Sequence, residues 1–471
     1  MNSPSAKRTT VCWMLLFLVV AAGCQETAPA RPTPPASNPP PVALQLAGTS
    51  SCSGRACHGN ASPVAGQAIQ LNEFATWALH DPHVGAYDVL LNERSKKIAR
   101  NLRIPGEKAE NDVRCLACHT NPLAALPDAA PLLQAERRFG VGCEACHGPA
   151  SGWLVSHTTA EWKKLTVAEK AKQGMVPVQD LVARAEMCAA CHVGQPADVA
   201  KGIPARDLYH DLLGAGHPRL SFELGSYLSN LPPHWLEKEQ EPGHEAKVWA
   251  VGQVVSAKSA LQLLAERAGN RSRPWPEFAE YDCAACHHDL REPAQWEPGT
   301  KGRHPLGALP WNNWYTTMLP SVLDKPPTQE LAALQVLMAK RYPDRDRTAQ
   351  QARAAEQALS AALPSLQQRK FDTAAVQQLL AKLARNGVPA GHGSWDTTDQ
   401  LSLALFALTE ADAHFRFQDA KLSPAERRQK VDGALQELLD QLTRETNGKR
   451  SLRRDADFRK DLDALLRRLG E

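Results

Sequence analysis

Two cysteines stand just ahead of a histidine at five places in this chain, and four of these places share the spacing C-x-x-C-H. In this motif the two thiols form thioethers with the edge of a haem, and the adjacent histidine becomes an axial ligand of its iron. A chain that carries five such motifs must fold around its cofactors, and we therefore predict five covalently attached haem c groups. The regular motifs are Cys115-Leu-Ala-Cys118-His119, Cys143-Glu-Ala-Cys146-His147, Cys188-Ala-Ala-Cys191-His192 and Cys283-Ala-Ala-Cys286-His287, and the stretched one is Cys52-Ser-Gly-Arg-Ala-Cys57-His58.

The number of cysteines agrees with this interpretation. The chain has 12 cysteines, and the two outside the motifs, Cys12 and Cys24, lie near the N-terminus. Structural zinc is one alternative, but zinc does not require a histidine directly after every second cysteine. For the stretched motif, a disulfide between Cys52 and Cys57 remains a second alternative.

The first 24 residues have the pattern of an export signal. Lys7 and Arg8 precede an apolar run from Val11 to Val20 that is too short to span a bilayer. The run ends in Ala-Ala-Gly-Cys24, which resembles a lipobox, and this predicts cleavage before Cys24 and lipidation of its thiol. An ordinary signal peptide is the alternative. We expect a protein on the periplasmic side, anchored to a membrane by lipid, and Gln25 favours the outer membrane.

Composition divides the remaining chain into three parts. Residues 25–48 are rich in proline, which predicts an extended tether. Residues 49–320 hold all five motifs, so we expect a pentahaem domain in which the haems form much of the core and lie close together. Residues 326–471 contain no cysteine and predict a haem-free helical domain. The net charge of +3 gives no indication of nucleic-acid binding.

The expected fold class is mainly α, with helices and loops packed around haems and a helical bundle after them. In the haem region, helical patterns cover residues 74–91 and 246–268, and no alternating strand pattern is evident. In the C-terminal region, apolar residues recur on one face between Phe371 and Leu383, ahead of Gly387. A capping box with proline at the first helical position opens a helix at Ser423. A last helix is expected over residues 455–469.

Each iron needs a sixth ligand or keeps an open position. The mature chain has few methionines, so histidine is the expected distal ligand, which lowers the reduction potential of a haem relative to methionine. The favoured distal ligands, chosen because they cluster among the motifs, are His83, His157, His210 and His217. His80 and His234 are weaker candidates, followed by His244 and His304. His288 is expected to point away from the neighbouring iron, and His392 and His414 fall in the haem-free region.

Several phrases resemble the cytochrome c-552/4 family, which is related to the tetrahaem cytochrome c that accepts electrons in ammonia oxidisers. They are the second motif, the phrase Gly140-Val-Gly-Cys-Glu-Ala-Cys-His-Gly-Pro149 followed by His157, and the Trp77–Tyr87 segment around His83. The resemblance covers roughly residues 50–290. It implies that His83 and His157 ligate neighbouring haems. The chain departs from the family in its stretched first motif, its fifth motif and its C-terminal region.

Three functions remain open from the sequence. The favoured one is electron transfer between a donor and an acceptor protein, neither of which the sequence identifies. The second is an enzyme that converts a small nitrogen or sulfur compound at one five-coordinate haem. The third, a structural or sensory haem protein, is least favoured because it would not need five haems. No lysine replaces a motif histidine, and no acid–base or nucleophile motif supports the enzyme.

Overall fold

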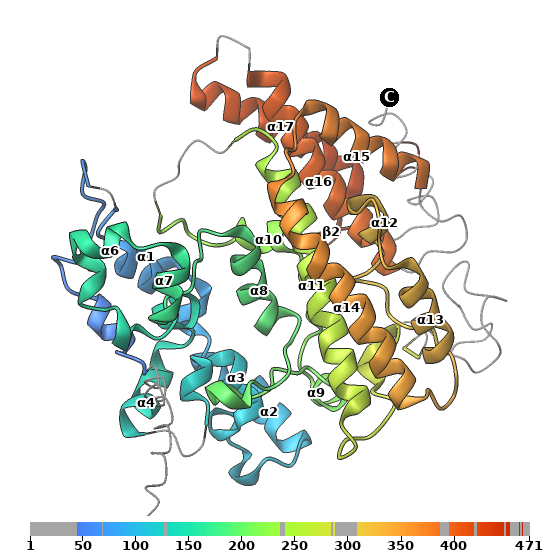
Figure 1. The fold of residues 1–471 in the computed structure, drawn as a ribbon, viewed down its shortest axis with the longest axis horizontal. Helices are drawn as coiled ribbons and strands as arrows, with labels where there is room; N and C mark the ends of the chain where they lie inside the picture. The colour runs from blue at the N-terminus through green and yellow to red at the C-terminus, as the bar shows by residue number, and fades with distance from the viewer. Residues whose placement is uncertain are drawn as a thin grey trace, which may run out of the picture. The chain divides into compact units, whose positions relative to one another are not determined.

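The computed structural model describes residues 45–67, 69–126, 130–235, 241–283, 286–287, 309–386, 395–418, 422–446 and 449–452, with residues 461 and 464. The described residues belong to one compact unit. The described fold is mainly α, as predicted (Figure 1). Signal sequence, Cys24 and nearly all of the proline-rich tether lie outside the described residues.

The first half of the compact unit consists of short helices joined by 3-10 turns and loops. Here the helical pattern over residues 74–91 predicted one element, and the structure breaks it into three. The first α-helix ends at His80, and 3-10 turns follow over Pro82–Gly85 and Asp88–Leu91. The break falls at Asp81-Pro82 because the residue before a proline is disfavoured in the helical conformation. The helices in this half are α1 (Glu73–His80), α2 (Glu93–Asn101), α3 (Val113–His119), α4 (Pro131–Glu136), α5 (Cys143–His147), α6 (Ala160–Lys164), α7 (Val167–Lys172), α8 (Leu181–His192), α9 (His210–Ala215) and α10 (Leu224–Leu228).

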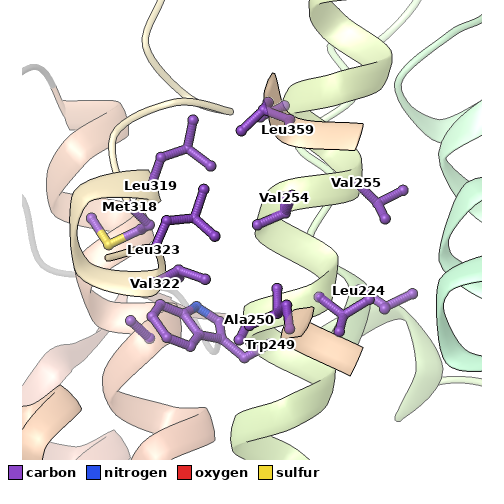
Figure 2. Packing of buried hydrophobic residues seen from close by; sticks show 14 of the residues in the cluster. Leu224, Trp249, Ala250, Val254, Val255, Met318, Leu319, Val322, Leu323 and Leu359 are labelled. Atoms are coloured by element: carbon purple, nitrogen blue, oxygen red, sulfur yellow. The ribbon is translucent and has the colours of Figure 1, made fainter. Parts of the chain in front are cut away.

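Helix α11 (His244–Gly269) is the central element of the main hydrophobic core, and it confirms the helix predicted over residues 246–268. It lies beside α14 (Arg345–Gln368) and contacts α8 and α16 (Trp395–Gln418) (Figure 1). In Figure 2, Trp249 and Val254 of α11 point toward the side chains of α12 (Leu319–Val322) and its neighbours. Among the described helices, α11 alone is long and apolar enough to cross a membrane. However, 83% of its most apolar 18-residue stretch is buried inside the protein, as in a core helix.

The C-terminal helices share this core with the motif-bearing region. The main cluster of buried residues runs from Ala185 in α8 to Leu438 in α17. The boundary predicted between residues 320 and 326 therefore falls inside one continuous core, and the division into two domains stays a prediction. The remaining helices are α13 (Thr328–Met338), α15 (Thr373–Asn386) and α17 (Pro424–Leu442).

Two sequence signals in this region are confirmed, and one feature was not predicted. Helix α15 occupies the segment with the apolar face, although Gly387 itself lies outside the described residues. The capping box before α17 is formed: Ser423 Oγ accepts from Glu426 N at 3.3 Å, and Glu426 Oε2 accepts from Ser423 N at 2.8 Å. An antiparallel pair of short strands, β1 (Thr443–Thr446) and β2 (Lys449–Leu452), follows α17. Of the helix predicted over residues 455–469, the structure describes two residues, Asp461 and Ala464, and both are helical.

Candidate haem sites

The histidines of the second, third and fourth motifs are the last residues of helices. Helices α3, α5 and α8 end at His119, His147 and His192, so the two cysteines and the histidine of each motif share the final turns. Aspartates begin α3 and α8: Asp112 Oδ1 accepts from Arg114 N, and Asp180 Oδ1 accepts from Ala183 N, both at 2.9 Å. These caps satisfy backbone N–H groups that a short helix leaves unpaired. We number the haem sites 1 to 5 in motif order.

Each motif histidine lies opposite one other histidine. The five pairs join residues that are far apart in the sequence, and every pair has nearly the same separation of ring centres. The pairs and separations are His58 and His157 (6.3 Å) in site 1, His119 and His217 (6.4 Å) in site 2, His147 and His234 (6.4 Å) in site 3, His192 and His83 (6.1 Å) in site 4, and His287 and His210 (6.4 Å) in site 5.

This separation fits two imidazoles on opposite sides of one metal ion. An imidazole nitrogen lies about 2 Å from a metal that it ligates. The same nitrogen lies about 1.1 Å from the centre of its own five-membered ring, because ring bonds are about 1.33 Å long. Two imidazoles in line through one ion therefore have ring centres about 6.2 Å apart. The residues present fit a six-coordinate iron at each of the five sites.

Hydrogen bonds at the Nδ1 atoms leave the Nε2 atoms of several paired histidines for a metal. Nδ1 of His58 donates to Glu73 Oε2 at 2.9 Å, and Nδ1 of His83 donates to Asp81 Oδ1 at 2.8 Å. The other acceptors are backbone carbonyls: Ala86 for His119 at 2.7 Å, Leu154 for His157 at 2.6 Å and Pro218 for His217 at 2.8 Å. A metal-binding histidine ordinarily donates its second N–H in this way, which fixes the ring orientation.

The electrostatic setting keeps the most buried of these histidines neutral. Burial lowers the pKa of His147 and of His192 to about 4, and burial also lowers the pKa values of His119 and His217. A ligating imidazole must be neutral, so these sites are already in the form that binds a metal. In contrast, the hydrogen bond to Asp81 raises the pKa of His83.

The glutamate of the third motif joins sites 1 and 3. Glu144 is buried, and its carboxylate accepts from the backbone N–H groups of Ala47 and Gly48 at 2.8 Å and of Ala150 at 2.6 Å. Glu136 accepts from Thr49 N at 2.6 Å. Both carboxylates therefore hold the segment that leads into Cys52 against the third motif.

Glycines in the same phrase allow close backbone approaches. Gly140 has φ +60°, and a Cβ there would lie 2.4 Å from the carbonyl oxygen of His83. Its neighbour Val141 donates to that carbonyl at 3.0 Å. Gly148 has φ +83°, where a Cβ would lie 2.0 Å from the oxygen of Gly174. The phrase around the third motif thus also positions His83, one of the two histidines of site 4.

The cysteines show which sites are neighbours. Cys52 of site 1 and Cys143 of site 3 are close enough that their interaction lowers the pKa of Cys52 and raises that of Cys143. Cys118 of site 2 and Cys191 of site 4 interact in the same way, which raises the pKa of Cys118 and lowers that of Cys191. Cys146 of site 3 is near enough to Cys191 for the charge of one thiolate to raise the pKa of the other thiol. Sites 1, 3, 4 and 2 therefore adjoin in that order.

Site 5 adjoins site 2 through α9. His210 begins this helix, and His217 follows its end by two residues. Tyr209 accepts a hydrogen bond from Arg114, which precedes the first cysteine of site 2, at 2.9 Å. A cavity of about 420 Å³ opens at this junction, and Arg114, Tyr209 and His210 lie on its wall.

A buried ion-pair network joins the two chain segments that carry the histidines of site 5. Arg267, near the end of α11, donates to Asp207 Oδ1 at 2.5 Å and to Glu280 Oε1 at 2.6 Å. Asp207 precedes His210, and Glu280 precedes the fifth motif. Arg273 also pairs with Asp207. This network holds both sides of site 5 to the main core.

The structure places all four favoured distal histidines opposite a motif histidine, and it adds His234. The sequence ranked His234 below these four, although it lies in the same stretch between the fourth and fifth motifs as His210 and His217. His80 is exposed, His244 begins α11, and His414 lies 3.3 Å from Glu245. His288, His304 and His392 lie outside the described residues.

The chemistry of the ten motif cysteines remains compatible with thioether formation. All ten are free, including Cys52 and Cys57, for which a disulfide was the alternative. Within the described ranges, no group of three or more histidine, cysteine, aspartate or glutamate side chains is placed to hold a metal ion.

The comparisons with known proteins give one match. Residues 52–148, which contain the first three motifs, match the family model described as cytochrome c554 and c-prime. No curated protein and no solved structure matches this chain significantly. The match does not distinguish a relation to the cytochrome of ammonia oxidisers from a relation to other members of the family, so that relation stays a prediction. The matched segment supports a multihaem c-type cytochrome, a haem protein of electron transfer.

Proposed function

We propose that this protein relays electrons through five covalently attached haems, each ligated by two histidines. The observation that carries the proposal is the set of five histidine pairs, all with ring centres 6.1 to 6.4 Å apart. An iron with two histidine ligands cannot bind a substrate unless it loses one of them. Five filled pairs therefore favour relay over an enzyme acting on a nitrogen or sulfur compound.

The order of the sites supports a continuous path. The adjoining cysteines give the order 1, 3, 4, 2, and α9 adds site 5 next to site 2. The two ends of this path are its most exposed parts, because Cys57 in site 1 and Cys283 and Cys286 in site 5 are exposed. We infer that electrons enter and leave at sites 1 and 5, through two redox partner proteins.

The haem supplies one-electron chemistry when bound, and the chain determines its position and surroundings. The two cysteines of each motif would hold the macrocycle edge, and the paired histidines would hold the iron. Glu73 and Asp81 accept hydrogen bonds from His58 and His83. These bonds make the two imidazoles stronger electron donors to the iron, which lowers the reduction potentials of the haems in sites 1 and 4. Two carbonyl-bonded imidazoles in site 2 give a weaker effect of the same kind.

The location of the protein is part of the proposal and rests on the sequence. We propose export to the periplasmic side and a lipid anchor at Cys24, with the proline-rich residues 25–48 as a tether. Cys24→Ser should move the protein from the membrane fraction to the soluble fraction. A mature N-terminus at a different residue would contradict the lipid anchor but not the relay.

The relay is tested by the haem count and by reactivity. The intact mass of the exported protein should exceed that of the processed polypeptide by five haems, and Cys57→Ser should alter attachment at site 1 alone. Because each of the five irons has two histidine ligands, carbon monoxide should bind none of the reduced haems. A gain of four haems would contradict the assignment of the stretched motif. Rapid turnover of hydroxylamine or nitrite with an artificial redox partner would contradict the relay itself.

A further inference from the structure

An ion pair joins the C-terminal helices to the haem region. Arg219 and Asp396 lie 177 residues apart, and the guanidinium donates to both carboxylate oxygens at 2.8 and 2.7 Å. Asp396 lies in the first turn of α16, and Arg219 follows His217 by two residues. The guanidinium also lies 5.4 Å from the centre of the Trp314 ring. Three segments of the chain therefore fix the position of these two charges.

Both charges lie close to the first cysteine of the fifth motif. Asn312 N donates to the carbonyl oxygen of Glu280 at 2.8 Å, and Asp282 N donates to that of Pro310 at 3.0 Å. The segment that carries Trp314, over which Arg219 lies, therefore runs beside the residues that lead into Cys283. In agreement with this placement, the charge of Arg219 lowers the pKa of the Cys283 thiol, and that of Asp396 raises it. The pair therefore lies beside site 5, although Arg219 also follows the site 2 histidine His217 by two residues.

The neighbouring contacts keep the start of α16 at this site. Asn313 Nδ2 donates to Thr397 Oγ1 at 2.9 Å, next to Asp396. Gln253 of α11 donates to Gln400 at 3.1 Å in the buried interface between the two helices. Of the two charged side chains, Asp396 is 10% exposed and Arg219 is 32% exposed. The carboxylate is thus the more buried member of the pair.

We infer that the Arg219–Asp396 pair is a part of site 5, that each of its two charges acts on the reduction potential of that haem, and that the two effects nearly cancel while the pair is intact. This inference rests on the proposed haem at Cys283 and Cys286. A positive charge near an iron favours the ferrous state, and a negative charge favours the ferric state. The two members therefore act in opposite directions, and α16 brings the C-terminal helices into the redox centre as positioning elements.

The test is a redox titration of the full-length, haem-loaded protein, followed optically and by electron paramagnetic resonance. Arg219→Gln leaves Asp396 uncompensated and should lower the potential of one haem. Asp396→Asn leaves Arg219 uncompensated and should raise the potential of the same haem. The double variant should return close to the unmodified protein. Arg219→Lys keeps the positive charge and should give a smaller shift than Arg219→Gln.

Two further variants identify the affected haem and control for the charge change. His210→Met should raise the potential of site 5 by itself, because methionine ligation raises haem potentials, and Arg219→Gln should then displace that same component. Asp412→Asn removes a carboxylate from the same helix, where Asp412 pairs with Arg416, and should shift no haem.

Each outcome of these measurements decides a separate question. Shifts of opposite sign in one haem support the inference. No shift, shifts of the same sign or equal shifts in all haems would overturn it, provided that the intact mass still shows five haems. A mass that shows no haem at Cys283 and Cys286 would instead overturn the proposed function at site 5, together with the inference built on it.

Discussion

Replacement of Arg267 by methionine should destabilise the protein by about 3 kcal/mol. Methionine fills a similar volume but has no charge and no hydrogen-bond donor. Arg267 is 7% exposed, and its partners Asp207 and Glu280 are 6% and 10% exposed. Removing one member of a buried ion pair costs about 3–5 kcal/mol, because it leaves a buried charge uncompensated.

The network itself places this loss at the lower end of the range. Asp207 keeps its second partner, Arg273, so only one carboxylate loses its cation. Glu280 keeps only the hydrogen bond from Trp311 Nε1, at 3.3 Å. We therefore expect a destabilisation of about 3 kcal/mol rather than 5 kcal/mol.

The loss should also depend on pH. Burial already raises the pKa of Glu280, and Arg267 opposes this effect. Without Arg267 the folded-state pKa rises further above its unfolded value, so the folded variant binds a proton more tightly than the unfolded chain. A raised pKa gives stability at low pH that is lost as the pH rises through the folded pKa. The deficit of the variant should therefore be largest at neutral and alkaline pH and should shrink in acid.

Urea unfolding followed by far-ultraviolet circular dichroism, at about pH 8 and about pH 5, measures both effects. The matched control is Arg271→Met, because Arg271 forms an exposed pair with Asp346 and should lose about 1 kcal/mol or less. A loss below about 1 kcal/mol for Arg267→Met, or a deficit that is equal at both pH values, would refute the reasoning about the buried network.

Three other predictions follow from the contacts in the haem sites. His234→Ala should convert one haem from low spin to high spin. His80→Ala should convert none, because His80 is exposed and faces no motif histidine. Electron paramagnetic resonance of the two variants measures the high-spin signal of each. Glu144→Ala removes the acceptor of three backbone N–H groups, so stability should fall by about 2 kcal/mol or more, and limited proteolysis should cut the chain ahead of Cys52; unchanged proteolysis would contradict this role. Glu73→Gln and Asp81→Asn should each raise the reduction potential of one haem in a redox titration, because the hydrogen-bonded imidazole becomes a weaker electron donor to the iron. A fall in potential would contradict the hydrogen bonds from His58 to Glu73 and from His83 to Asp81.

The sequence predicted the composition of the haem sites better than their assembly. Cysteines and motif histidines follow from a local spacing, which needs no knowledge of the fold. The pairing does not: His83 lies between the first and second motifs in the sequence, yet it faces His192 of the fourth. That pairing depends on the backbone approach between His83 and Val141, a contact between distant segments.

Other features were hidden because they depend on tertiary contacts or on weak local signals. His234 has no characteristic phrase around it, so the sequence could rank it only by position. Asp396 and Arg219 give no sign that they pair across 177 residues. In contrast, the break after His80 could have been found, since Asp81-Pro82 is a standard signal for the end of a helix. The helical periodicity on both sides of Asp81-Pro82 obscures this signal.

Electron paramagnetic resonance of the fully oxidised protein, with spins counted against the haem content, tests the central claim most directly. The account predicts five low-spin haems and no stoichiometric high-spin signal. The imidazole planes are near-parallel in sites 1 and 5, at 14° and 30°, and steeply inclined in sites 2, 3 and 4, at 68° to 83°. Because the angle between the ligand planes sets the splitting of the iron orbitals, the low-spin signals should fall into classes of two and three haems. A high-spin signal equal to one whole haem would contradict the account.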